Sequence, residues 1–301
     1  MRILHVDTGR EMRGGQRQVL LLLSGLRSAG EVCTLLAREG SPLFESALKA
    51  GFAVYSADLG NLLIHSGKTD IVHVHDARAH TLAALAARTR FVVSRRVAFP
   101  VKRSPLSQRK YRRASRFLAV SHFVASVLES ANVAKNKIDV VYDGVDPNVT
   151  LGEWSAGGPV VALASADPAK GRALVAAAAH IAGLEVTYSD DLLRDLKRAS
   201  LFVYATQNEG LGSAALLAMA MGIPVIASDV GGLREALGFG EAGVLVQNEP
   251  AAIATAILRF REDSALARTL VEQGKQRVAK HFTAQIMVDR TLESYRRALA
   301  L

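Results

Sequence analysis

Residues 206–235 read TQNEGLGSAALLAMAMGIPVIASDVGGLRE and combine an acid, two closely spaced glycines, an uncharged run and a second glycine pair. Glu209 stands in the loop after an apolar strand, and Gly210 and Gly212 leave backbone amides bare there. Ser213 begins a run of Ala, Leu and Met without charge, which predicts a helix that is buried all round. Such a helix points free N–H groups at the carboxyl edge of a sheet, where a diphosphate is the natural ligand.

Short apolar strands alternate with helices on both sides of this stretch. The alternation begins at residues 3–6 and begins again at residues 159–165, after the polar, glycine-containing segment NVTLGEWSAGG. Apolar strands that alternate with helices predict parallel sheets covered on both faces. We therefore expect an α/β protein with doubly wound domains at 1–150 and 151–283, followed by a helix at 284–301.

Composition limits the class and the localisation of the protein. The chain has 301 residues, half of them hydrophobic, which is enough for a sizeable core in each half. Its single cysteine, Cys33, excludes an internal disulfide and fits a reducing cytoplasm. The start MRILHVD lacks the apolar region of a signal peptide, and no uncharged apolar run reaches the roughly 20 residues of a membrane span. A cytoplasmic protein is expected.

Positive charge is concentrated in the first half, where residues 1–150 hold 22 Lys and Arg but 12 Asp and Glu. Much of the excess lies in residues 94–116, which contain no acid. The basic residues of this stretch are Arg95, Arg96, Lys102, Arg103, Arg109, Lys110, Arg112, Arg113 and Arg116. They form either a solvated loop and helix face or a patch for an anionic membrane, phosphorylated lipid or sugar. The stretch has only Phe99 and Tyr111 for base stacking, so nucleic acid is not expected as a partner.

The loops after strands hold the candidate site residues, because ligands of open parallel sheets bind beyond the carboxyl ends of the strands. Gly14 and Gly15 in RGGQRQ form either a simple turn or a close approach to an anion. The dinucleotide fingerprint G-x-G-x-x-G is absent, so NAD binding is not supported. His73 and His75 share one face of a strand. We expect His73 to be a core histidine and His75, at the strand end, to contact a ligand; with no further ligands nearby in sequence, a metal site is not expected.

Lys170 ends the loop ADPAKG just before a helix in the second half. It is either an ordinary surface lysine or a point charge that meets a phosphate with help from the helix dipole. Gly231 and Gly232 are expected to form another turn that exposes the backbone, shortly before Glu235.

The segment NEGLGSAALLAMAMGIPVIASDVGGLREAL resembles the donor-site segment of retaining GT-B glycosyltransferases, in particular family 4, also called glycosyl transferases group 1. RGGQRQ, DIVHVHD, FLAVSHFVASVL, VVYDGVDP and DPAKG are similar to further segments of that family and follow its order. The resemblance implies two Rossmann-like domains facing across a cleft, the first on the acceptor side and the second binding a nucleotide-sugar. The final helix would cross back onto the first domain.

The resemblance also implies the roles of individual residues. His75 would contact the transferred sugar, Lys170 would neutralise the leaving diphosphate and Glu209 would bind the sugar hydroxyls; these three form the implied catalytic set. The implied donor-binding residues are Gly14, Gly15, Lys170, Glu209, Gly210, Leu211, Gly212, Ser213 and Leu217. Protein cations and helix dipoles stabilise the leaving group in such enzymes, so the resemblance implies neither a metal nor a cofactor, only a nucleotide-diphosphate-sugar as donor substrate.

The sequence departs from the family pattern at two positions and is shortened at a third. A second glutamate eight positions after Glu209 usually holds the ribose, and here that position is Leu217. An arginine five residues before the loop lysine usually clamps the diphosphate, and here that position is Ser165. Such losses typically cost roughly a few kcal/mol of binding. The segment between Lys170 and Leu201 is also shorter than in most family members.

Three functions are compatible with these features. The first is a metal-independent, retaining hexosyltransferase that moves a sugar from a nucleotide-diphosphate-sugar to an anionic cell-envelope glycan, lipopolysaccharide or glycolipid, with a peripheral contact at the inner face of the membrane. The second is a catalytically degenerate relative that binds a ligand or partner, which Leu217 and Ser165 favour. The third is another sugar-nucleotide enzyme of the same fold, an epimerase or a phosphorylase. Donor turnover separates the first from the second, and the product separates the first from the third.

Overall fold

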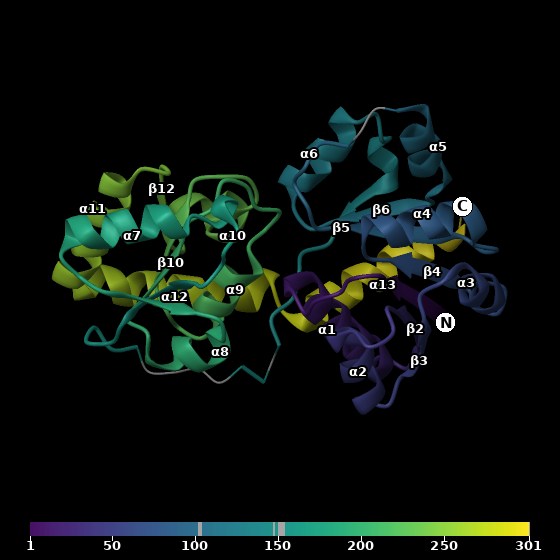
Figure 1. Ribbon diagram of the computed structural model, residues 1–301, viewed down its shortest axis with the longest axis horizontal. Helices are drawn as coiled ribbons and strands as arrows, with labels where there is room; N and C mark the ends of the chain where they lie inside the picture. Colours follow the sequence, from purple (N-terminus) through teal and green to yellow (C-terminus); the bar gives the residue numbers. More distant parts are fainter. Residues whose placement is uncertain (102–103, 147, 150–153, 301) are drawn as a thin grey trace. The chain divides into compact units, whose positions relative to one another are not determined.

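The computed structural model describes residues 1–101, 104–146, 148–149 and 154–300. In this part of the chain, two compact units are formed by residues 1–144 with 284–301 and by residues 145–283 (Figure 1). Each unit has its own parallel sheet and its own hydrophobic core. The domain boundary expected between residues 150 and 151 lies outside the described residues.

The first unit is built on one parallel sheet, to which its described residues contribute seven strands in the order β3-β2-β1-β4-β5-β6-β7. The strands are β1 (Arg2–Asp7), β2 (Val32–Ala37), β3 (Ala53–Ser56), β4 (Ile71–Val74), β5 (Phe91–Arg95), β6 (Arg116–Ala119) and β7 (Ile138–Val140). This is the Rossmann strand order with one strand added. The order reverses between β1 and β4, so the loops that follow these two neighbouring strands diverge and leave room for a ligand.

The helices of the first unit come from both ends of the chain. They are α1 (Gly14–Ser28), α2 (Pro42–Lys49), α3 (Leu59–Ser66), α4 (Ala77–Ala86), α5 (Pro105–Arg113), α6 (His122–Ser130) and α13 (Ala284–Ala300). In α1, Leu22 and Leu26 recur at helical spacing and are buried in the core. Helix α13, drawn in yellow in Figure 1, packs against α1 where Gly25 has no side chain: a Cβ there would lie 2.5 Å from Val288 Cγ2.

A buried charged network fastens α13 to the sheet of the first unit. The carboxylate of Asp139 on β7 accepts hydrogen bonds from the guanidinium of Arg116 on β6, with Nη2 to Oδ1 at 2.8 Å. Two residues of α13 also reach this carboxylate, Ser294 through Oγ and Arg297 through Nη1, each at 2.8 Å. Burial alone would raise the pKa of Asp139, but the hydrogen bonds from Arg116 and Ser294 and the two positive charges outweigh it and lower that pKa.

The second unit has a different strand order. Its described residues contribute five strands to a parallel sheet in the order β12-β11-β10-β8-β9. The strands are β8 (Val160–Leu163), β9 (Val186–Ser189), β10 (Leu201–Tyr204), β11 (Val225–Ser228) and β12 (Val244–Val246). Counted from β8, this is the flavodoxin-like order 2-1-3-4-5 read from the other edge. The order reverses between β8 and β10, so the loops after these two strands diverge.

Helices cover both faces of this second sheet. They are α7 (Arg172–Ala182), α8 (Leu192–Asp195), α9 (Ser213–Ala220), α10 (Leu233–Ala236), α11 (Pro250–Glu262) and α12 (Ser264–His281). Ile253 and Ile257 of α11 pack into the core against strand residues such as Val203. Helix α9 begins at Ser213 as predicted, but it is not buried all round: Leu217 is half-buried. With both units described, the α/β class with doubly wound sheets is confirmed.

Replacing Asp139 by Asn should destabilise the first unit, because the buried Arg116 would lose its counter-charge. We expect a loss of about 3 kcal/mol in the free energy of unfolding, measured by urea denaturation. As a control, Glu293→Gln removes an exposed ion-pair partner of Arg290 and Arg297 on helix α13 and should cost less than about 1 kcal/mol. Equal losses in the two variants would contradict the role given to Asp139.

The Asp139–Arg116 pair also predicts how the stability of the protein depends on pH. Because the pKa of Asp139 is lower in the folded chain than the usual 3.8, the stabilisation that its carboxylate provides is fully present above about pH 5. It is lost as the pH falls through the folded-state pKa, and Asp139→Asn should flatten this part of the stability profile.

Candidate active site

Two charged residues of the second unit, Lys170 and Glu209, lie next to each other where its strand order reverses. Lys170 ends a short 3-10 turn (Pro168–Lys170) in the loop after β8, and Glu209 lies in the loop after β10. Lys170 Nζ stands 2.9 Å from Glu209 Oε2, and the lysine side chain remains 32% exposed. The two residues that the sequence assigns to a phosphate and a sugar are therefore brought into direct contact, although 39 positions separate them.

Two further groups hold the Glu209 carboxylate. The buried hydroxyl of Tyr204, at the end of β10, donates a hydrogen bond to Oε2, and the backbone N–H of Gly210 donates to Oε1 at 3.0 Å. Burial, followed by the charge and the hydrogen bond of Glu209, raises the pKa of Tyr204 well above its ordinary value, so the hydroxyl stays protonated and acts as a donor. Tyr204 was missed in the sequence because a tyrosine at the end of a buried strand carries no distinguishing pattern.

The second glycine pair permits a close approach of two backbones. Gly232 N donates to Glu209 O at 3.0 Å, and a Cβ on Gly232 would lie 1.9 Å from Gly210 O. Gly212, at the start of α9, has a φ of +105°, and a Cβ there would lie 2.5 Å from Leu233 Cδ2. The turn at 231–232 thus supports the loop that carries Glu209, and this explains a glycine pair that we had expected to expose backbone.

Ser165 and Leu217, the two residues that depart from the family pattern, lie in the loop after β8 and on helix α9. Ser165 Oγ accepts a hydrogen bond from Asp167 N at 3.2 Å and so stabilises the loop that leads to Lys170. Leu217 lies half-buried on α9. The guanidinium of Arg172, the first residue of α7, stacks on the ring of Tyr188 at 4.7 Å.

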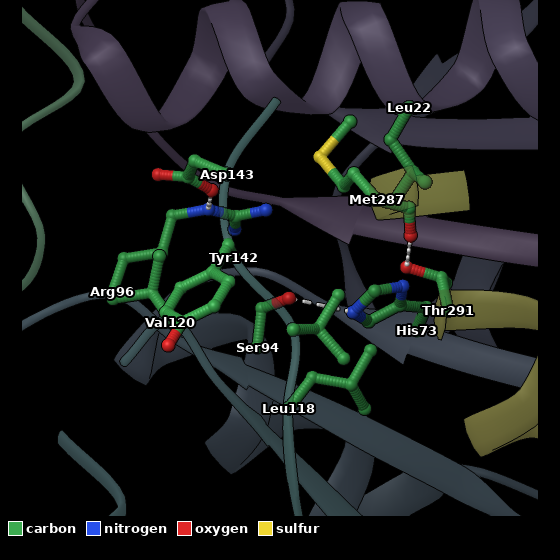
Figure 2. A pocket seen from close by; sticks show the side chains of 11 residues that line it. Leu22, His73, Ser94, Arg96, Leu118, Val120, Tyr142, Asp143, Met287 and Thr291 are labelled. Carbon is green, nitrogen blue, oxygen red and sulfur yellow. Dashed lines mark hydrogen bonds and ion pairs between the residues drawn. The ribbon is translucent and has the colours of Figure 1, made fainter. Parts of the chain in front are cut away.

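In the first unit, His75 lies at the β1–β4 reversal, in contact with a cation. The His75 side chain is buried, and its Nδ1 stands 3.4 Å from Nη1 of Arg96. Arg96 Nε donates in turn to Asp143 Oδ1 at 2.9 Å (Figure 2). A Cβ on Gly15, at the start of α1 beside Gly14, would lie 3.9 Å from Arg96 Cδ. Arg96, which the sequence assigns to the basic patch, therefore lies next to both Gly15 and His75.

The imidazole rings of His5, His73 and His75 lie close together on one face of the first unit's sheet. His5 on β1 pairs in register with His73 on β4, and His5 Nδ1 lies 3.0 Å from His75 Nε2. His73 is a core histidine, as predicted: its Nδ1 lies 2.6 Å from the hydroxyl of Tyr295 on α13, and its Nε2 lies 2.8 Å from Ser94 Oγ. Figure 2 shows the Ser94 contact in a small pocket that Arg96 and Tyr142 also line.

Hydrogen bonding assigns the protons in this cluster. A guanidinium only donates, so His75 Nδ1 accepts from Arg96 and His75 Nε2 carries the proton that His5 Nδ1 accepts. His5 Nε2 then carries a hydrogen, and it has no partner among the described residues. Burial, and after it the charge of Arg96, lowers the pKa of His5 to about 3; burial, then the neighbouring His73, lowers the pKa of His75 well below its usual value. Both rings are therefore neutral at neutral pH.

The same three histidines form the candidate metal-binding cluster of the described residues, with one nitrogen from each within 4.8 Å of the others. Imidazole nitrogens suit Zn²⁺, Cu²⁺ and Ni²⁺. Both nitrogens of His73 are already engaged by hydroxyls, and Arg96 places a positive charge beside His75. The arrangement favours three neutral imidazoles that position one another. Sequence spacing missed His5, which only the Rossmann order brings beside His73.

The basic patch is divided by the structure. Arg109, Arg112 and Arg113 are exposed on α5, whereas Lys110 is half-buried with its Nζ 3.4 Å from Ala77 O. Burial, then the charge of Arg95, lowers the pKa of Lys110. Arg95 Nη2 donates to Phe99 O at 2.5 Å. Lys102 and Arg103 lie outside the described residues.

Apolar side chains stand among these cations. Phe99 is 65% exposed, Leu106 is 81% exposed and Val97 is 44% exposed. Residues 105–113 are all described, and none of them is buried. In the described part of the chain, no helix is long and apolar enough to cross a membrane.

Solved structures share this architecture along the whole chain. Anabaena HepE in complex with UDP matches with a TM-score of 0.86 at 16% identity, covering 98% of this chain and 100% of that one. Sucrose-phosphate synthase from Thermosynechococcus elongatus matches with a TM-score of 0.79 at 18% identity, covering 99% of each chain. The protein therefore has the GT-B fold of two Rossmann-like domains.

Family models identify the protein more closely. The model "Glycosyltransferase Family 4" matches residues 12–149, and the model "Glycosyl transferases group 1" matches residues 177–277. The chain belongs to this glycosyltransferase family, so the resemblance noted in the sequence is confirmed.

Curated relatives match over shorter stretches. D-inositol 3-phosphate glycosyltransferase of Salinispora arenicola is 39% identical over 112 residues, which are 37% of this chain and 25% of that protein. The capsular polysaccharide biosynthesis glycosyltransferase CapM of Staphylococcus aureus is 30% identical over 103 residues, or 34% of this chain and 27% of that protein. The matched segments thus span about a quarter of the length of these relatives.

Gly171 offers a test of the loop that carries Lys170. Its φ is +67°, and a Cβ there would lie 2.7 Å from the carbonyl oxygen of Ala205. Gly183 has a similar φ of +62° with nothing within 4 Å. We expect Gly183→Ala to cost about 1 kcal/mol in the free energy of unfolding from backbone strain alone, and Gly171→Ala to cost about 3 kcal/mol from strain and overlap. Urea denaturation measures both, and equal costs would contradict the close packing of the two loops.

Proposed function

We propose that this protein is a retaining glycosyltransferase that moves a hexose from a nucleotide-diphosphate-sugar to an anionic glycan or lipid-linked acceptor of the cell envelope. The observation that carries the proposal is the contact of Lys170 with Glu209 at the β8–β10 reversal, in the loops where a sheet of this kind binds its ligand. Family membership supports the activity, and HepE, a protein of the same fold, was solved with UDP and with UDP-glucose.

The proposed reaction separates charge, and the site contains a cation and backbone amides that can stabilise the negative charge. As the bond from the anomeric carbon to the diphosphate breaks, negative charge grows on the phosphate oxygens. In the proposed reaction Lys170 and the backbone amides near Leu211 and Gly212 stabilise that charge without a metal or cofactor. Glu209 binds sugar hydroxyls, and the contact of His75 with the sugar remains a prediction from the family resemblance. The acceptor hydroxyl attacks on the face that the diphosphate leaves, and a diphosphate oxygen takes its proton, so no protein nucleophile is required.

A catalytically degenerate relative is the second candidate function. Ser165 and Leu217 favour it, because neither side chain can replace an arginine clamp or a ribose-binding carboxylate. Binding and turnover of a donor separate the two candidates. An epimerase or phosphorylase of the same fold would be recognised by its product.

A thermal-shift screen tests the donor site. UDP, GDP, ADP, dTDP and CMP, each with its common sugar conjugates, are added to the full chain. A nucleotide at 100 times its dissociation constant should add about 2.7 kcal/mol of stability. Lys170→Met should abolish the shift, whereas Lys197→Met, which removes an exposed lysine from the same unit, should keep it. A well-folded protein that responds to none of these compounds would overturn the proposed donor site and favour the degenerate relative.

We propose that the exposed part of the basic patch contacts the acceptor's membrane, at the inner face in the cytoplasm. Arg109, Arg112 and Arg113 supply charge for anionic headgroups, and Phe99 and Leu106 supply apolar area for the interface. The few aromatic residues of this stretch support a membrane or glycan rather than nucleic acid.

Vesicle cosedimentation tests this contact. Wild-type protein should bind phosphatidylglycerol-containing vesicles in preference to pure phosphatidylcholine. Arg109→Ser with Arg112→Ser should weaken binding about 30-fold, at about 1 kcal/mol per charge. Arg259→Ser with Arg261→Ser removes the same charge from exposed positions of α11 and should leave binding unchanged. Equal weakening by both pairs would indicate a net-charge effect and contradict a specific surface.

A further inference from the structure

The carboxylate of Glu209 is held by two kinds of partner. Tyr204 and Lys170 both donate to the same oxygen, Oε2, while Gly210 N–H holds the other oxygen. Because two groups donate to Oε2, the carboxylate keeps one strong hydrogen bond at this oxygen when the other donor is lost.

The two side-chain partners differ in mobility. Tyr204 belongs to β10, its ring is buried beside Phe202, and Gly212 packs on its edge, with Cε1 3.5 Å from the Cβ position. Lys170 reaches Glu209 from a loop, at the end of a flexible side chain that is one-third exposed. The lysine can therefore change partner while the tyrosine keeps its place.

We propose that Tyr204 is a positioning residue for Glu209 and that the Lys170–Glu209 ion pair is exchangeable: an anion takes Lys170 while the Tyr204 hydroxyl keeps the carboxylate in place. This inference rests on the proposed function, because it assigns the anion to the donor's diphosphate. It explains how Glu209 can remain oriented toward a sugar after its counter-charge has turned to the phosphate. Tyr204 stays protonated throughout, since burial and the adjacent carboxylate raise its pKa.

Calorimetric titration with inorganic pyrophosphate tests the exchange in the full chain. Glu209→Gln removes the competitor for Lys170 and should tighten pyrophosphate binding about tenfold. Tyr204→Phe leaves Glu209 more dependent on Lys170, so it should weaken binding about tenfold. In the double variant the effect of Tyr204→Phe should disappear, because the tyrosine acts through Glu209. Tyr188→Phe is the matched control: it removes a buried hydroxyl without a partner among the described residues of the same unit.

The double variant separates positioning from a merely structural role. If Tyr204→Phe weakens binding equally in the wild-type chain and in the Glu209→Gln variant, or does not weaken it at all, the inference is overturned while the proposed donor site stands. If Glu209→Gln leaves the affinity unchanged, Lys170 is not in competition and the exchange is overturned.

A ligand-free measurement keeps the two proposals distinguishable. Gly210 N–H donates to Glu209 Oε1, so its hydrogen exchange reports whether the carboxylate stays in place. Tyr204→Phe should speed this exchange about tenfold, and Tyr188→Phe should leave it unchanged. Failure of every variant to bind pyrophosphate overturns the proposed donor site and the exchange with it. An unchanged Gly210 amide in Tyr204→Phe overturns the positioning role alone.

Discussion

The reversal of strand order within each parallel sheet is the constraint on which the rest of this protein depends. Strands that run the same way end at one edge, and crossovers that leave two neighbours in opposite directions keep their loops apart. In the first unit this happens between β1 and β4, beside His75 and the Gly14–Gly15 loop. In the second unit it happens between β8 and β10, where Lys170 meets Glu209. The candidate site residues therefore lie at two places that the strand order defines.

Buried polar groups are hydrogen-bonded to one another at the first of these places. In the first unit the three histidines are neutral: His5 is hydrogen-bonded to His75, and His75 accepts from Arg96. His73 is hydrogen-bonded to Tyr295 and Ser94 instead. Helix α13 takes part in this network, and its Ser294 and Arg297 reach Asp139 as well. The last helix of the chain is thus held to the first unit by hydrogen bonds that are costly to leave unmade, in addition to its apolar face.

The second unit uses glycines and one tyrosine to position its loops and Glu209. Gly232 and Gly171 let neighbouring loops approach at distances that any side chain would prevent, and this fixes the loops that carry Glu209 and Lys170. Tyr204 then gives Glu209 a partner that does not depend on Lys170. Ser165 accepts a hydrogen bond from Asp167 within its own loop, and Lys170 supplies positive charge next to Glu209.

The sequence by itself determined the fold class and the family, because strand and helix periodicities are local and the motif around Glu209 is contiguous. It also assigned Lys170, Glu209 and His75 to loops and strand ends. It could not show that His5 lies beside His73, that the Arg96 side chain contacts His75, or that Tyr204 donates a hydrogen bond to Glu209. Those contacts join residues on neighbouring strands and diverging loops. Only the tertiary structure decided them, because strand order and backbone packing set which distant side chains meet, and no local pattern records that order.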